Sequence, residues 1–155
     1  MANIRLIKPG DNKKLADLFS IISRDEIIKK FFHPHPLTKE HAEKICQEAN
    51  KRKDLYFIAI NNNEATGYAM LRGWDEGYDI PSFGICVHPS YQGRGTGKEL
   101  TNYAIKLCKE KKSKKMMFKV YKDNLIACEL YKKIGVDFKG ETHDKKQWIG
   151  YLNLK

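Results

Sequence analysis

The most informative stretch of this chain is Val87-His88-Pro89-Ser90-Tyr91-Gln92-Gly93-Arg94-Gly95-Thr96-Gly97. A strand pattern ends at Pro89, three glycines follow, and a helical pattern begins. Glycine permits tight backbone turns and leaves its N–H groups uncovered. The first turn of a helix adds unpaired N–H donors and the positive end of its dipole. The stretch therefore predicts an anion site suited to a phosphate or pyrophosphate, with Arg94 and Lys98 adding positive charge.

Two common phosphate-binding motifs do not fit this loop. A Walker A loop would need glycine where Gln92 stands, and serine or threonine where Glu99 stands. A dinucleotide fingerprint starting at Gly93 would need glycine in place of Lys98, and it belongs in an opening βαβ unit. A glycine-rich turn without any ligand stays open as the plain alternative, although three glycines cost backbone entropy.

The sequence before the loop predicts strands and helices in a recognisable order. Ile4 and Leu6 alternate with polar residues, as in a short strand. Apolar residues at helical spacing then predict two helices, the first capped by Asp11 or Asn12 and the second by Thr38. Residues 55–60 and 66–71 should form a hairpin around a turn at 61–64. The apolar positions of the two helices are Leu15, Leu18, Phe19 and Ile22, and Ala42, Ile45, Cys46 and Ala49.

The sequence after the loop alternates helices with strands. A helix with Leu100, Ala104, Leu107 and Cys108 on its buried face leads to a strand over residues 116–121. A helix over 124–134 closes at Gly135, and strands over 136–138 and 147–152 follow. The prediction is an α/β fold of one domain over residues 1–155. Its sheet is mixed, mostly antiparallel and of about seven strands, and about four helices flank it.

Composition limits the class of protein. The 155 residues are 41% hydrophobic and 31% charged, which excludes a disordered, collagenous or membrane-spanning chain. The 29 basic and 19 acidic residues give a net charge of +10, which favours an anionic partner. Only five of the basic residues are arginines, and this scarcity argues against nucleic acid.

Targeting and redox signals point to the cytoplasm. The start of the chain lacks the apolar run of a signal peptide. The four cysteines form no C-x-x-C pair, so buried, reduced thiols are expected: Cys46, Cys86, Cys108 and Cys128. His33, His35 and His41 match no strong zinc template, and no metal is expected.

At two places the chain resembles the GNAT superfamily of acyl-CoA-dependent N-acetyltransferases. The family's Q/R-x-x-G-x-G/A pattern is filled by Gln92, Gly95 and Gly97 at a strand–loop–helix junction. The family's second signature, an Asn, a Tyr in the same helix and then a Gly, is matched by Asn124, Tyr131 and Gly135. The order of elements is similar over nearly the whole chain, with the first half less specific.

The resemblance implies a role for each matched residue. Backbone amides from the loop would cradle the pyrophosphate of coenzyme A, and the preceding strand would bond its main chain to the pantetheine arm. Asn124 would help to hold that arm, and Tyr131 would stand near the thioester sulfur as the general acid. The cofactor-binding residues expected on this basis are Ile85, Cys86, Val87, Gln92, Gly93, Arg94, Gly95, Thr96, Gly97, Lys98 and Asn124.

The implied reaction is the transfer of an acetyl group from acetyl-CoA to a primary amine by direct attack in a ternary complex. The acceptor amine must lose a proton first, at a cost of roughly 4–5 kcal/mol at pH 7. Some family members place a carboxylate on the strand before or after the loop, but here those strands read Pro81-Ser82-Phe83-Gly84-Ile85-Cys86 and Met117-Phe118-Lys119-Val120. The general base stays open among Asp79, Glu76, His88 and an ordered water.

The acceptor and the assembly also stay open. The acceptor is a small-molecule or a protein amine, and a homodimer is neither required nor excluded by the sequence. In the family, the region of Phe31-Phe32-His33-Pro34-His35 lines the acceptor pocket, but a packed connector is the alternative. Trp74, Asp75, Glu76, Tyr78 and Asp79 form an acidic, aromatic turn that could receive a cationic amine or could simply be solvated.

Two other classes of function compete with an acetyltransferase. The missing carboxylate allows a CoA-binding sensor that has lost catalysis. The lysine-rich composition allows a basic nucleic-acid-binding module, although no readout motif is found.

Overall fold

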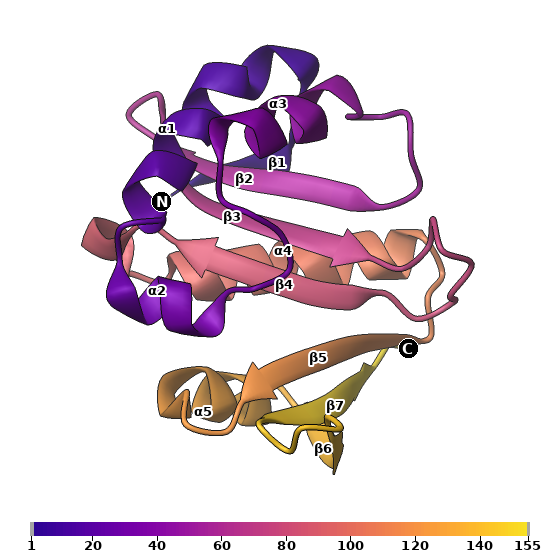
Figure 1. Ribbon diagram of the computed structural model, residues 1–155. Coiled ribbons are helices and arrows are strands. Elements are labelled where there is room, and N and C mark those ends of the chain that lie inside the picture. The colour runs from indigo at the N-terminus through magenta and orange to yellow at the C-terminus, as the bar shows by residue number, and fades with distance from the viewer. Residues whose placement is uncertain (1, 155) are drawn as a thin grey trace.

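A seven-stranded sheet forms the centre of the computed structural model, which describes residues 2–154 (Figure 1). Its order is β1-β2-β3-β4-β5-β7-β6. Only β4 and β5 run parallel, which confirms the prediction of a mixed and mostly antiparallel sheet. The strands are β1 (Asn3–Leu6), β2 (Leu55–Asn61), β3 (Glu64–Arg72), β4 (Ser82–Val87), β5 (Lys115–Tyr121), β6 (Asp137–Glu141) and β7 (Gln147–Asn153).

Helices cover both faces of the sheet. The α-helices are α1 (Asn12–Ile22), α2 (Glu26–Phe31), α3 (Lys39–Gln47), α4 (Thr96–Glu110) and α5 (Leu125–Lys133), and two 3-10 helices are η1 (Pro9–Asp11) and η2 (Pro89–Tyr91). The sequence prediction missed the short α2. Its signals are local: Asp25 caps it by accepting from the N–H groups of Ile27 and Ile28, and Lys29 and Lys30 lie in its last turn.

The core has two halves, one on each face of the sheet. One half joins α4 and α5 to the sheet through residues such as Leu100, Phe118 and Tyr131. The other joins α1 and α3 to the opposite face through residues such as Phe19 and Tyr68. The apolar residues predicted for the inner faces of α1, α3 and α4 lie within those helices and are buried. The exception is Ala49, which lies just beyond the end of α3.

Two local details test the predicted turns and caps. The hairpin of β2 and β3 closes through Asn62 and Asn63, both with positive φ, as a tight two-residue hairpin loop requires. Asp11 occupies the N-cap position of α1, one of the two predicted, but its side chain makes no capping hydrogen bond. The Asp11 carboxylate instead pairs with Arg5 at 2.7 Å and accepts from the backbone N–H of Lys8 at 2.7 Å, so it ties β1 to η1.

The parallel contact between β4 and β5 is short. It covers only Ser82 with Met117 and Phe83 with Phe118, whereas β4 pairs with β3 along its whole length. Figure 1 shows the two strands diverging towards their carboxyl ends. We call the region between residues 84–87 of β4 and residues 119–121 of β5 the β4–β5 gap. Among the helices of residues 2–154, none combines the length and apolarity that crossing a membrane requires.

Candidate functional site

The glycine loop lies at the end of β4, beside the β4–β5 gap. Gly93 and Gly95 have φ of 78° and 88°, a left-handed backbone that favours glycine. The first helical bond of α4 runs from the N–H of Glu99 to the carbonyl of Gly95 at 2.9 Å. The N–H groups of Thr96, Gly97 and Lys98 therefore precede the bonded part of the helix and are free to meet an anion.

The loop leaves room for a ligand. A Cβ atom added at Gly93 or Gly95 would meet nothing within 4 Å, and Gln92, Arg94 and Lys98 are exposed. The Arg94 guanidinium lies 5.2 Å from the ring centre of Tyr91, which holds its charge beside the loop. The side chain of Gln92 donates to the carbonyl of Val87 at 3.3 Å and so ties the loop to the end of β4.

The edge of β4 that faces the gap carries main-chain groups that pair with no other strand, although the carbonyl of Val87 accepts from the Gln92 side chain. The N–H of His88 donates to Thr66 of β3 at 2.9 Å, and the carbonyl of Pro81 accepts from Met117 of β5 at 2.8 Å. Successive residues of a strand direct these groups to opposite edges, so those of Ile85 and Val87 face the gap and those of Cys86 face β3. The gap therefore offers a strand-like edge to an extended ligand, built from Ile85 and Val87.

The cysteines have the properties of packed, inert thiols. All four are free and buried. Burial raises the pKa of Cys46 to about 11 and that of Cys108 to about 12, and it raises the pKa of Cys86 further. A thiol that holds its proton is a poor nucleophile, so the arrangement favours direct attack over a covalent acyl-cysteine step.

Asn124 and Tyr131 lie on α5, across the gap from the glycine loop. The Asn124 side-chain oxygen accepts from the N–H of Ala127 at 3.3 Å and caps the helix, which leaves its amide N–H₂ group for a ligand. The Tyr131 ring packs on Phe118, the last residue of β5 that pairs with β4, with ring centres 4.7 Å apart. Tyr131 is thus placed where the gap begins.

The Tyr131 hydroxyl is protonated. Burial, with a smaller effect of Cys128, raises the pKa of Tyr131, so the phenol keeps its proton at neutral pH. No buried side-chain oxygen within residues 2–154 lacks a hydrogen-bond partner. Tyr131 is 6% exposed, and its hydroxyl bonds to no other described residue.

A segment that we call the strap, residues 26–35, lies on the side of the sheet opposite α4. It consists of α2 and the turn that follows it (Figure 1). Lys30 pairs with Asp123 at 2.9 Å, and the ring centre of Phe31 lies 5.7 Å from that of Tyr121 at the end of β5. These contacts bring the strap to the β5 side of the gap. The segment packs, as a connector would, and it also borders the gap; its role as a wall of the acceptor pocket stays a prediction.

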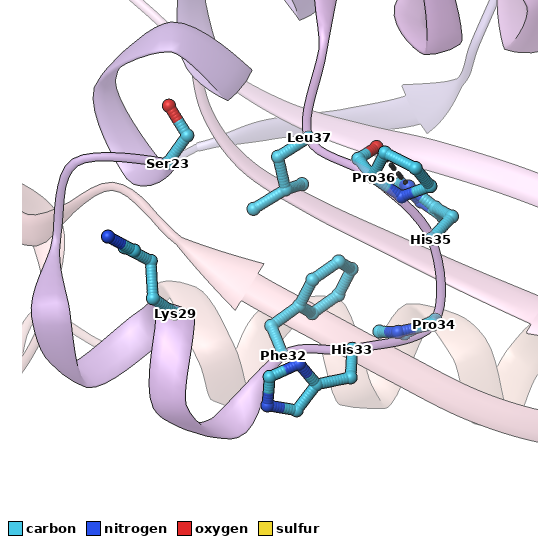
Figure 2. Close-up of a pocket in the computed structure, with 8 residues that line it drawn as sticks. All are labelled: Ser23, Lys29, Phe32, His33, Pro34, His35, Pro36 and Leu37. Carbon is cyan, nitrogen blue, oxygen red and sulfur yellow. Dashed lines mark hydrogen bonds between the residues drawn. The ribbon is translucent and has the colours of Figure 1, made fainter.

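The other end of the strap is fixed to β3. His35 Nε2 lies 2.9 Å from the hydroxyl of the fully buried Tyr68, and Arg72 donates to the carbonyl of Pro34 at 3.2 Å. A shallow hollow of about 580 Å³ lies beside the strap (Figure 2). Its lining residues are Ser23, Lys29, Phe32, His33, Pro34, His35, Pro36 and Leu37.

The acidic, aromatic turn lies away from this site. It precedes β4, so the length of that strand, about 20 Å, separates it from the glycine loop. Asp75 accepts from the N–H groups of Lys53 and Asp54, and Asp54 accepts from those of Gly73 and Asp75. Asp75 therefore holds two turns together. Glu76 and Asp79 lie in the same turn, and they are equally far from the glycine loop.

Comparison with known proteins points to the same family as the two sequence motifs. A model of the acetyltransferase (GNAT) family matches residues 16–136. A Bacillus subtilis protein, provisionally named a ribosomal protein bS18-alanine N-acetyltransferase, is 31% identical over 81 residues, which are 52% of this chain and 52% of that protein. The match therefore spans about half the length of that curated relative.

Two solved structures show the same fold along nearly the whole chain. The ribosomal-protein-S5-alanine acetyltransferase from Vibrio fischeri has a TM-score of 0.83 at 15% identity, covering 99% of this chain and 93% of that one. The PaiA N-acetyltransferase from Thermoplasma acidophilum, in complex with coenzyme A, has a TM-score of 0.79 at 17% identity, covering 99% of both chains. At these identities the likeness is one of fold.

Proposed function

The chain belongs to the GNAT family of acetyltransferases, and from that premise we propose that it transfers an acetyl group from acetyl-CoA to a primary amine. The observation that carries this proposal is the β4–β5 gap, where the edge of Ile85 and Val87, which pairs with no strand of the sheet on this side, leads directly to the glycine loop. Acetyl-CoA supplies the activated acetyl thioester. We place the activity in a single domain that the whole chain forms, and in the cytoplasm, where reduced cysteines are the rule.

The residues around the gap fit coenzyme A in polarity and in shape. The open amides of the loop, with Arg94 and Lys98, suit a pyrophosphate. The main chains of Ile85 and Val87 suit the amides of a pantetheine arm, and the free amide N–H₂ group of Asn124 is a further donor. The main-chain groups of Cys86 point towards β3 and not into the gap. Cys86 would therefore contribute through its position between Ile85 and Val87.

Tyr131 is the proposed general acid. A phenol that keeps its proton in a buried setting can give it to a leaving thiolate. The four buried thiols leave no nucleophile for a covalent intermediate, so the amine attacks directly.

We propose the α-amine of a protein N-terminus as the first acceptor class to test. The support is the Bacillus subtilis relative, whose provisional name gives an alanine of a ribosomal protein as the acceptor. The strap borders the gap on the side opposite α4, and the acceptor would approach there.

The first experiment compares thermal unfolding with and without acetyl-CoA. Binding to the native state at 100 times the dissociation constant should add about 2.7 kcal/mol and raise the midpoint by several degrees. Release of free thiol is then measured with short alanyl peptides and with small amines, each against the same compound blocked at its amine. The absence of a shift with both acetyl-CoA and CoA would overturn the assignment of the loop.

A further inference from the structure

The proton acceptor of the proposed reaction does not lie on either strand of the gap. Residues 84–87 of β4 and 119–121 of β5 contain no carboxylate. An amine acceptor is an ammonium ion at neutral pH and must lose a proton before it can attack. We propose that His33, on the strap, takes this proton through its Nδ1 atom; this inference rests on the acetyltransferase function proposed above.

The position of His33 follows from contacts on both sides of it. Before it, Lys30 and Phe31 hold the strap to Asp123 and to the Tyr121 ring. After it, His35 holds the strap to Tyr68 of β3. The strap passes from β5 to β3 over the intervening β4, so His33 lies across the gap on the side opposite α4.

The His33 ring itself contacts the far strand of the gap. Its centre lies 5.8 Å from that of Tyr121, at an interplanar angle of 74°. Figure 2 shows the imidazole below the turn that follows α2. The side chain therefore stays at the gap instead of turning into the core beneath the strap.

The hydrogen bond of His33 selects one tautomer. Its Nε2 atom lies 2.8 Å from the backbone carbonyl of Lys30. A carbonyl oxygen only accepts, so Nε2 carries the hydrogen and Nδ1 of the neutral ring keeps an unused lone pair. The ionisable group in contact with the ring is Tyr121, Lys29 lines the same hollow as His33, and the charge of the preceding Lys30 is paired with Asp123. The exposed ring can pass an acquired proton to solvent.

The other histidines do not combine a position at the gap with a ring nitrogen whose lone pair is unused. His35 uses Nδ1 on the carbonyl of Pro36 and Nε2 on the hydroxyl of Tyr68. His88 uses Nδ1 to accept from the N–H of Ser90 at 3.0 Å. His41 lies on α3 and stacks on His35, and His143 lies in the turn between β6 and β7.

The protons and bonds of the acetyl transfer balance as follows. One N–H proton of the ammonium moves to His33 Nδ1, and the freed nitrogen lone pair forms a bond to the acetyl carbon. The bond from that carbon to sulfur breaks, and the departing thiolate takes the proton of the Tyr131 hydroxyl. A second N–H proton leaves the nitrogen as the amide forms and returns Tyr131 to its neutral state, while the imidazolium of His33 gives its proton to water.

The test compares His33→Gln with the wild type and with His143→Gln. Glutamine can keep a donor towards the Lys30 carbonyl but offers no base. We expect kcat to fall about 100-fold at pH 7 in His33→Gln, with unchanged stabilisation by acetyl-CoA. With an alanyl peptide the deficit should shrink as the pH rises through about 8, and with an alkyl amine as it rises towards about 10.4, because each amine then loses its proton unaided. In His33→Ala, added imidazole should restore part of the rate. His143→Gln should behave as the wild type at every pH.

Two results would overturn the inference. One is a wild-type rate in His33→Gln; the other is a deficit that stays constant with pH and resists imidazole, which would indicate a structural role. Failure of the proposed function itself would look different, because the wild type would then show neither stabilisation by acetyl-CoA nor thiol release with any amine.

Discussion

Tyr131 shows how one side chain can have a packing role and a chemical role at once. Its ring belongs to the core through Phe118 at the start of the β4–β5 gap, and its hydroxyl bonds to no other described residue. Burial raises the pKa of this phenol, which keeps the proton available for transfer. The two roles rest on different atoms, so a substitution can separate them.

Replacing Tyr131 with phenylalanine should lower kcat by about 100-fold, because only the proton donor is lost. The midpoint of thermal unfolding and the affinity for acetyl-CoA should stay close to the wild-type values, since the ring contact with Phe118 remains. Steady-state kinetics and thermal unfolding together check this. Tyr103→Phe, on α4, is the matched control and should turn over normally. Unchanged turnover in Tyr131→Phe would remove Tyr131 from the reaction.

At the scale of elements, the junction of β4, the glycine loop and α4 has a strained backbone with empty space beside it. Gly93 and Gly95 adopt positive φ where added side-chain atoms would meet no protein atom. Packing of the protein itself does not require empty space beside a strained backbone. A bound pyrophosphate does require such space. The turn before β4 offers a comparison, because Gly77 has φ of 93° and equally open surroundings.

Gly95→Ala and Gly77→Ala should therefore lose similar stability, about 1 kcal/mol each, from the left-handed backbone alone. Only Gly95→Ala should also weaken acetyl-CoA binding, by about tenfold or more, because its methyl group occupies the cradle. Denaturant titration gives the stability and calorimetry the affinity. Equal affinities in the two variants would show that the ligand does not contact this turn.

At the scale of the whole molecule, the strap couples the first third of the chain to the far half of the sheet. Its anchor at β3 is the bond between the Tyr68 hydroxyl and His35 Nε2, which requires a neutral imidazole because Nδ1 donates to the Pro36 carbonyl. Burial lowers the pKa of His35 to about 4, and the nearby His41 and Arg72 act in the same direction. The charge state of one partly buried ring thus bears on the stability of the fold.

Stability should fall as the pH drops from about 6.5 to about 4. In this window the unfolded chain binds a proton at residue 35 and the folded chain does not, so the free energy of unfolding decreases. Partial exposure of the ring limits the effect to about 2 kcal/mol. His35→Gln can keep an acceptor for Tyr68 without titrating, and its unfolding midpoint should depend less on pH. If its pH profile matched that of the wild type and of His143→Gln, the coupling would be refuted.

Much of the fold could be predicted from the sequence because the signals are local. Thr38 caps α3 by accepting from the N–H of His41, Asn124 caps α5, and Gly135 ends it with φ of 101°. The capping hydrogen bond predicted for α1 is absent for the opposite reason: Arg5, on β1, competes for the Asp11 carboxylate through tertiary contact. α2 was missed because its six residues are too few for a periodic pattern to be distinct.

What the sequence determined by itself is the order of the elements, the glycine loop with its anion-binding amides, and the two motifs that indicate the family. Each depends on residues a few positions apart, whose caps, turns and periodicity act over one or two helical turns. The β4–β5 gap, the direction of the Ile85 and Val87 main chains and the place of His33 were decided only by the tertiary structure. They depend on where strands more than thirty residues apart stop pairing, and on side chains such as Tyr68 and Tyr121 that hold the strap from opposite sides.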